Sequence, residues 1–282
     1  MNNKTKVERC YEGVGMFSVL ISKLVVKKET LFSHYNWDVL RELVRANFKQ
    51  MENNFVLGSL WGLVGPVGML GTLYFIFRSR FGIHIETYPL YLLIGIVLTN
   101  FFVSVTVSLL RVFFSNRELA LNSAVSREVL ILARLSISAY SFLIELIFCY
   151  VVSAFYGYFY WQALCLILPL FLAYIGLLLG IGFFLGVLFC FAKDIEHLWA
   201  LISRLFFFAT PIFYSLNDLS PFGKTLVYYL NPVTPFLISF RGVLMRDVSF
   251  FPYFHSLLIG LIFFAVGYSL FLLTENVMVE KI

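Results

Sequence analysis

QALCLILPLFLAYIGLLLGIGFFLGVLFCFA, from Gln162 to Ala192, is a stretch of 31 residues without one charged side chain. A transmembrane helix needs about 20 predominantly apolar residues, so this stretch can span a bilayer if it tilts or extends beyond the core. The whole chain of 282 residues is 60% hydrophobic and 13% charged, whereas a soluble domain is about 25% charged. No soluble fold of this length can bury so much apolar surface, so the sequence predicts an all-α, multi-pass membrane protein.

Six segments qualify as spans by length and apolar character. They are expected at about 55–77, 88–110, 135–156, 162–192, 198–216 and 250–274. With both termini in the cytoplasm, 16 of the 21 Lys and Arg residues lie on cytoplasmic segments. The other five are Arg78, Arg80, Lys224, Arg241 and Arg246. Since basic residues collect on the cytoplasmic side, the sequence predicts a cytoplasmic-membrane protein with both termini inside.

Before the first span we expect a cytoplasmic tail (residues 1–33) and an amphipathic helix (34–53), which contains YNWDVLRELVRANFKQM from Tyr35 to Met51. Its apolar stripe would suit the membrane interface, with basic residues at the lipid headgroups. Packing on another protein surface is the alternative. The stripe comprises Trp37, Leu40, Leu43, Val44 and Phe48. The candidate headgroup and interface residues are Trp37, Arg41, Arg45 and Lys49.

Two short helices are expected between the last two spans, in SPFGKTLVYYLNP (Ser220–Pro232) and TPFLISFRGVLM (Thr234–Met245). Ser220 and Thr234 are good N-cap residues, and each precedes a proline suited to the first helical position. At about 10 residues, or roughly 15 Å, neither helix can cross a bilayer. The sequence predicts a re-entrant helical hairpin on the outer side, or else a hairpin lying flat on the outer leaflet.

Three stretches together resemble the membrane subunit of ABC-2 type exporters, in the branch that moves lipid-linked polysaccharides, O-antigens and teichoic acids. RELVRANFKQMENNFVLGSLWGLVGP (Arg41–Pro66) is similar to the interface helix and first span of that family. FCFAKDIEHLWALISRLFFFATPIFYS (Phe189–Ser215) is similar to its F-x-R-D-I-x-H turn and following span, with Lys193 in place of the arginine. YYLNPVTPFLISFRGVLM (Tyr228–Met245) is similar to its N-P-x-T-P stretch, which ends in an arginine. The resemblance covers about residues 35–282.

The resemblance implies a homodimer in the bacterial cytoplasmic membrane, paired with two copies of a cytoplasmic ATPase that binds ATP and Mg²⁺. This chain would hold no cofactor of its own. Gly223-Lys224-Thr225 does not complete a phosphate-binding loop, because Asp218 stands where that motif needs a glycine. The resemblance also implies an ATPase-coupling helix in the first cytoplasmic loop. Its candidate residues are Asn116, Arg117, Glu118, Ser126, Arg127 and Glu128.

Two charged residues fall within expected spans, where such groups usually face a bundle interior or water. Glu145 and Arg204 could pair with each other, or each could line a channel. Aromatic side chains suit the passage of sugars, whose rings have apolar C–H faces, and Pro211 would kink the fifth span. The candidate channel and gate residues are Phe207, Phe208, Pro211, Tyr214, Tyr229, Phe236 and Phe240.

The sequence therefore predicts a transport subunit that exports a lipid-linked polysaccharide or teichoic-acid-like polymer and has no catalytic residue. The four cysteines and four histidines lack metal-ligand spacing, and nothing points to nucleic acid as a partner. The main alternative is an ABC-2 permease for a drug or a lipid. A membrane enzyme is disfavoured because the acidic residues are scattered, and an ion-coupled carrier would rest on Glu145 alone.

Overall fold

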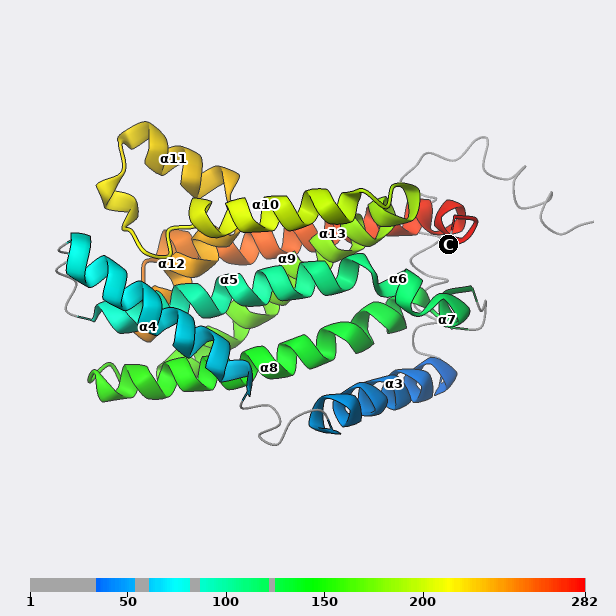
Figure 1. Ribbon diagram of the computed structural model, residues 1–282, viewed down its shortest axis with the longest axis horizontal. Coiled ribbons are helices and arrows are strands. Elements are labelled where there is room, and N and C mark those ends of the chain that lie inside the picture. Colours follow the sequence, from blue (N-terminus) through cyan, green and yellow to red (C-terminus); the bar gives the residue numbers. More distant parts are fainter. Residues whose placement is uncertain (1–33, 54–60, 82–86, 122–124, 282) are drawn as a thin grey trace, which may run out of the picture.

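The structure is a computed structural model that describes residues 34–53, 61–81, 87–121 and 125–281. The described residues form helices and no strand, as the sequence predicts (Figure 1). The expected tail (1–33) and the start of the expected first span lie outside the described residues. The helices are α3 (His34–Asn53), α4 (Trp61–Phe81), α5 (Tyr88–Leu110), α6 (Val112–Ser115), α7 (Arg117–Leu121), α8 (Arg127–Phe155), α9 (Gln162–Phe191), α10 (Ile195–Ala209), η2 (Leu216–Asp218), α11 (Pro221–Leu230), α12 (Val233–Leu244) and α13 (Phe250–Val279).

Four of the described helices are long and apolar enough to cross a membrane, so the chain is a multi-pass membrane protein. They are α5, α8, α9 and α13. Helix α5 has the bounds expected for the second span, and helix α9 ends one residue before the bound expected for the fourth. The third begins at Arg127 rather than near 135, and the helix of the expected fifth span ends at Ala209 rather than 216. The count of six spans stays a prediction.

Helices α9 and α13 form the most extensive helix pair, and glycines bring their backbones together. A Cβ added at Gly180 would collide with the Phe263 carbonyl, and one added at Gly260 would collide with the Ala173 carbonyl. In a membrane, water expulsion does not drive helices together, so close van der Waals packing at small residues stabilises them instead. The two glycines therefore set the distance between these helices.

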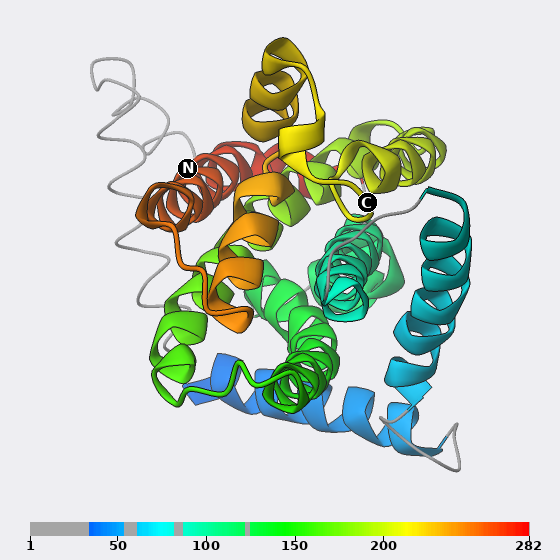
Figure 2. The ribbon, with the colours of Figure 1, turned by 90° about the vertical axis from the view of Figure 1, so that its left-hand side faces the viewer.

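Helix α5 lies at the centre of the bundle (Figure 2) and packs against α4, α8, α9, α10 and α12. It has no polar face, as expected of a helix that is surrounded by other helices or by lipid. The hydroxyls of its buried Thr99 and Thr106 donate to the carbonyls of Gly95 and Phe102, one helical turn earlier.

The two ends of the bundle differ (Figure 1). The terminal end, as we call it, holds α3, α6, α7 and the C-terminus, and the hairpin end holds α11 and α12. At the terminal end α3 lies across the bundle beneath α8 (Figure 2). The buried Asn36 side chain donates to Ser126 Oγ at 3.2 Å and accepts from the Ser126 backbone N–H at 3.1 Å. This reciprocal pair attaches the first turn of α3 to the N-cap of α8.

At the hairpin end the two expected short helices are present as α11 and α12. The expected cap at Ser220 is confirmed, because its hydroxyl accepts from the Gly223 N–H at 3.2 Å. The expected cap at Thr234 is wrong, because α12 already begins at Val233, whose N–H donates to the Asn231 side chain. Almost every residue of α12 is buried, whereas α11 buries none. A re-entrant position in the membrane stays a prediction.

Candidate functional site

The site at the hairpin end is built around the point where α10 stops. Pro211 has no backbone N–H and cannot continue the hydrogen bonding of the helix. The segment that follows α10 therefore contains buried carbonyl groups that need other donors. Arg241 of α12 supplies them: Nη1 donates to the Pro211 carbonyl and Nη2 to the Ile212 carbonyl, both at 2.7 Å. Its Nε and Nη2 also donate to the Tyr91 carbonyl of α5, at 3.1 and 3.0 Å.

Arg241 reaches this position because α5 has a glycine opposite it. A Cβ at Gly95 would lie 2.9 Å from Nη2 of Arg241, closer than real Cβ contacts come. On the other side, the guanidinium carbon lies 3.3 Å from the centre of the Tyr91 ring, a cation–π contact. The arginine is thus fully enclosed and joins α5, α12 and the end of α10.

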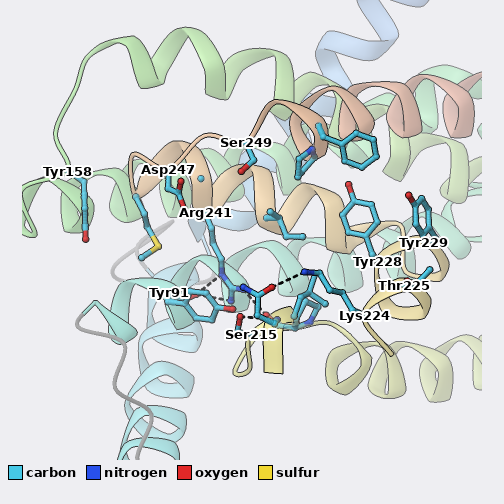
Figure 3. A pocket seen from close by; sticks show the side chains of 18 residues that line it. Tyr91, Tyr158, Ser215, Lys224, Thr225, Tyr228, Tyr229, Arg241, Asp247 and Ser249 are labelled. Carbon is cyan, nitrogen blue, oxygen red and sulfur yellow. Dashed lines mark hydrogen bonds between the residues drawn. The ribbon is translucent and has the colours of Figure 1, made fainter. Parts of the chain in front are cut away.

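Arg241 forms part of the wall of a pocket of about 770 Å³ (Figure 3). The pocket lies between α11, α12 and the start of α13, and residues 215–217 close a further side. Its lining includes five aromatic residues: Tyr91, Tyr158, Tyr228, Tyr229 and Phe251. None of the lining residues belongs to α4 or α10.

The aromatic wall has one packed part and one open part. The rings of Tyr228 and Phe251 stack on His255, with centroids 5.3 and 5.7 Å from it. Desolvation by burial raises the pKa of Tyr228 to about 12, so its phenol keeps its proton near neutral pH. Tyr229 meets Tyr228 edge-on at 82° and its side chain is largely exposed. Much of the Tyr229 side chain is therefore accessible to a ligand, as is that of Phe251.

Polar side chains border the same pocket. Nζ of Lys224 donates to Oδ1 of Asn217 at 2.8 Å. An ammonium has three donors, so Lys224 keeps N–H groups for a ligand. Asp247 and Ser249 lie across the pocket from Lys224, in the segment between α12 and α13 (Figure 3), and both are exposed. The pocket can therefore offer ring faces, donors and acceptors together.

The predicted channel and gate residues do not form one group. Pro211 and Tyr229 line the pocket. Phe236 and Phe240 are fully buried and pack on Tyr174 inside the helix bundle. The remaining three form a third group at and just beyond the end of α10, where the Phe208 side chain is 65% exposed. This third group comprises Phe207, Phe208 and Tyr214.

Sequence reasoning gave Arg241 no role. It counted this arginine among those outside the cytoplasm, although the motif YYLNPVTPFLISFRGVLM contains it. The available signal was a single arginine inside an apolar helix, a residue costly to bury without partners. Its partners are backbone carbonyls 29, 30 and 150 residues away, which no side-chain pattern reveals.

At the terminal end, the predicted coupling residues separate into exposed and structural members. Arg117 and Glu118 are exposed on α7, and Asn116 is half-buried just before it. Ser126 and Glu128 are buried. Ser126 is the N-cap residue of α8, and its hydroxyl accepts from Asn36 rather than from the helix.

Arg127 connects three helices at this end. Its Nη1 lies 2.5 Å from Oε1 of Glu275 in α13, and its Nε donates to the Ala120 carbonyl of α7 at 3.2 Å. The two charged side chains are only 17% and 8% exposed. A second ion pair joins Arg111, at the end of α5, to Glu196 in the first turn of α10. The short helices α6 and α7 are thus attached at both sides to the bundle.

The expected headgroup residues are exposed along α3: Arg41, Arg45 and Lys49, with Trp37 52% exposed. The rest of the predicted apolar stripe is half-buried on α3, which packs against α8. Phe48, for example, meets Tyr140 edge-on, with ring centroids 5.0 Å apart. Trp37 departs from the stripe because the buried Asn36 occupies the contact with α8 in that turn.

The two charged residues that were predicted to lie within spans are on different helices. In the described part of the chain Glu145 and Arg204 form no ion pair with each other. Glu145, on α8, faces Gly62 of α4, where an added Cβ would lie 3.8 Å from Oε1. Arg204 is exposed on α10, next to the exposed Leu205. No cluster of His, Cys, Asp or Glu suited to a metal ion occurs among residues 34–53, 61–81, 87–121 and 125–281.

Comparison with known proteins places these features in a family. The model of the ABC-2 type transporter family matches residues 38–245, a range that includes most of the described helices. Two curated relatives, both from Klebsiella pneumoniae and both named O-antigen export system permease protein RfbA, are each 25% identical to the chain over 241 residues. Each alignment covers 84% of this chain and 92% of the relative.

Proposed function

Because the chain belongs to the ABC-2 type transporter family, we propose that it is the transmembrane subunit of an ATP-driven exporter of a lipid-linked polysaccharide. The observation that carries this proposal is the match to permeases named for O-antigen export along nearly their whole length. The aromatic and polar pocket at the hairpin end supports a carbohydrate substrate rather than an apolar drug.

In this proposal the protein has six spans, with α4 and α10 added to the four long helices. The hairpin end faces outward and both termini lie in the cytoplasm, as the distribution of Lys and Arg favours. The interface helix α3 then lies at the cytoplasmic surface of the inner membrane of a bacterium. Its exposed Arg41, Arg45 and Lys49 would bind the charged pyrophosphate of a lipid-linked glycan.

Two copies of the chain face each other through α4 and α10, and the polymer passes between them. These helices lie on the same side of the bundle (Figure 2). Arg204 is exposed on α10, and an arginine inside a membrane favours a water-filled path over lipid. The apolar side chains exposed on the two helices include Val64, Val67, Phe75, Leu198, Leu201, Leu205 and Phe208.

The ATPase subunits, which bind ATP and Mg²⁺, contact α7 through Arg117 and Glu118. A push on α7 reaches α13 through Arg127 and Glu275, and reaches α10 through Arg111 and Glu196. The far end of α10 is held by Arg241. Closure of the ATPase would therefore tilt α10 between two anchored ends and open the path beside it.

The test is purification of the tagged chain from its own membranes in mild detergent, with mass spectrometry of the proteins that accompany it. We expect an ATPase with a phosphate-binding loop in a ratio of one to one with the permease. Its ATP hydrolysis should rise with lipid-linked glycan and not with drugs or ordinary phospholipids. Stimulation by drugs alone would favour an ABC-2 drug permease instead. A chain that purifies alone and moves substrate without ATP would refute the proposal.

A further inference from the structure

We propose that the pocket at the hairpin end binds one or two neutral sugar units of the exported chain. This inference rests on the proposed function, because the passing polymer is the source of the ligand. The binding site is separate from the proposed path of the polymer beside α4 and α10, because no residue of these two helices lines it. A volume of about 770 Å³ lies within the range of roughly 300–1,000 Å³ of pockets that hold small ligands.

The open ring of Tyr229 provides the apolar contact. Tyr228 and His255 meet it at 82° and 63°, so neither ring stacks flat on it. The side chain is 62% exposed at the edge of the pocket. A pyranose ring has a face made of C–H groups, which matches a flat aromatic surface. The stacked rings of Tyr228, His255 and Phe251 behind Tyr229 hold this wall in place.

The polar groups suit hydroxyls. Lys224 offers N–H donors from α11, and Asp247 offers acceptor oxygens from the segment before α13 (Figure 3). They approach the cavity from different walls, and Tyr229 and Asp247 lie on opposite sides of it (Figure 3), so one sugar unit near Tyr229 can bond Lys224 and a second can reach Asp247. Asn217, whose Oδ1 already accepts from Lys224, orients that ammonium group.

The charge of the pocket favours a neutral ligand over a phosphate polymer. Of the lining residues only Lys224 and Arg241 are cationic and only Asp247 is anionic. Arg241 donates four hydrogen bonds to backbone carbonyls inside the protein, and its side chain is buried. Lys224 and Asp247 carry opposite charges, so Lys224 is the one cationic side chain among the described lining residues with N–H groups left for a polyol phosphate, and it faces a carboxylate in the same pocket.

The test uses the permease with its ATPase in lipid nanodiscs, without ATP, and measures binding by calorimetry and saturation-transfer NMR. The probe is the neutral fraction of glycan chains released by mild acid from the cells that carry this protein. A glycerol phosphate oligomer is the comparator. We expect the neutral glycan to bind, Tyr229→Ala to weaken binding roughly fivefold (about 1 kcal/mol), and Tyr229→Phe to bind like the native protein because the ring remains.

The matched control is Phe222→Ala, which removes another exposed aromatic residue of α11 that does not line the pocket, and it should leave binding unchanged. The inference is overturned if the neutral glycan does not bind, if Tyr229→Ala binds it as well as the native protein, or if glycerol phosphate binds as tightly. ATP-driven glycan movement that continues in those cases would leave the proposed function standing. Loss of that movement in the native complex would instead refute the proposed function itself.

Discussion

The two ends of the bundle are each secured by arginines, but the partners differ. At the terminal end Arg127 binds the carboxylate of Glu275. At the hairpin end Arg241 donates its hydrogen bonds to backbone carbonyls. A side-chain partner can be changed together with the arginine, whereas a carbonyl stays wherever the backbone places it. The terminal end can therefore be rebuilt by a compensating substitution, and the hairpin end cannot.

The largest effect is expected from Arg241→Met, which keeps an apolar stem but removes every donor. The carbonyls of Pro211 and Ile212 would be buried without partners, which costs about 4 kcal/mol for the two. We expect a much lower unfolding temperature in detergent and faster proteolysis near residues 214–220. Arg241→Lys should recover only part of this loss, because a point-like ammonium cannot replace the planar fork. Native-like unfolding of Arg241→Met would contradict the role given to this residue.

The next effect concerns the terminal end. Arg127→Gln and Glu275→Gln should each lower the free energy of unfolding by about 2 kcal/mol. The loss is smaller than on breaking a fully buried ion pair, because both side chains keep some exposure. In the ATPase complex each should lower glycan-stimulated hydrolysis without preventing assembly. The double variant Arg127→Glu with Glu275→Arg should recover at least part of the loss. If the double variant instead showed the sum of both losses, the ion pair would not be the connection between α7 and α13.

A smaller effect at the hairpin end is expected from Gly95→Ala. Its methyl group would meet Nη2 of Arg241 at 2.9 Å and Cγ2 of Ile212 at 3.0 Å, so one of them must shift. Overpacking of this kind costs about 1.5 kcal/mol. Thermal unfolding should show this loss. Gly68→Ala on α4, where nothing lies within 4 Å of an added Cβ, is the matched control and should be neutral.

The smallest effect is expected from Glu42→Gln on α3. The ion pair of Glu42 with Arg45 is exposed, with side chains 67% and 69% accessible. Exposed pairs contribute roughly 0–1 kcal/mol, so unfolding should not change measurably. Asn36→Ala in the same helix should cost more, because it leaves the buried Ser126 N–H without its acceptor. If Glu42→Gln and Asn36→Ala changed the free energy of unfolding equally, Asn36 would not attach α3 to α8.

Much of the fold follows from local sequence signals. The apolar runs placed α5 and α9 nearly to the residue, and Ser220 marked the start of α11 because its hydroxyl bonds the backbone within one turn. The family was also predictable, because its motifs lie in order along the chain. The end of α10 was missed, because Arg241 stabilises that break from thirty residues further along.

The site was less predictable than the fold. Aromatic residues that are close in sequence take different positions. Phe236 and Phe240 fill the core, whereas Tyr229 lines the pocket. Almost every residue of α12 is buried, and the helices that cover it, α5, α9 and α13, come from distant parts of the sequence. Sequence alone therefore predicts that aromatic side chains matter at this end, but not which of them a substrate can reach.

The most direct test of the central claim is ATP-driven movement of a lipid-linked glycan in proteoliposomes that contain this chain and its ATPase. The account predicts that ATP transfers the glycan across the bilayer, where an added glycosidase reaches it. It also predicts that a hydrolysis-deficient ATPase, or the permease carrying Arg127→Gln, abolishes or strongly lowers that transfer. Transfer at the same rate without ATP, or no transfer of glycan while a drug or an unmodified lipid is moved, would contradict the claim.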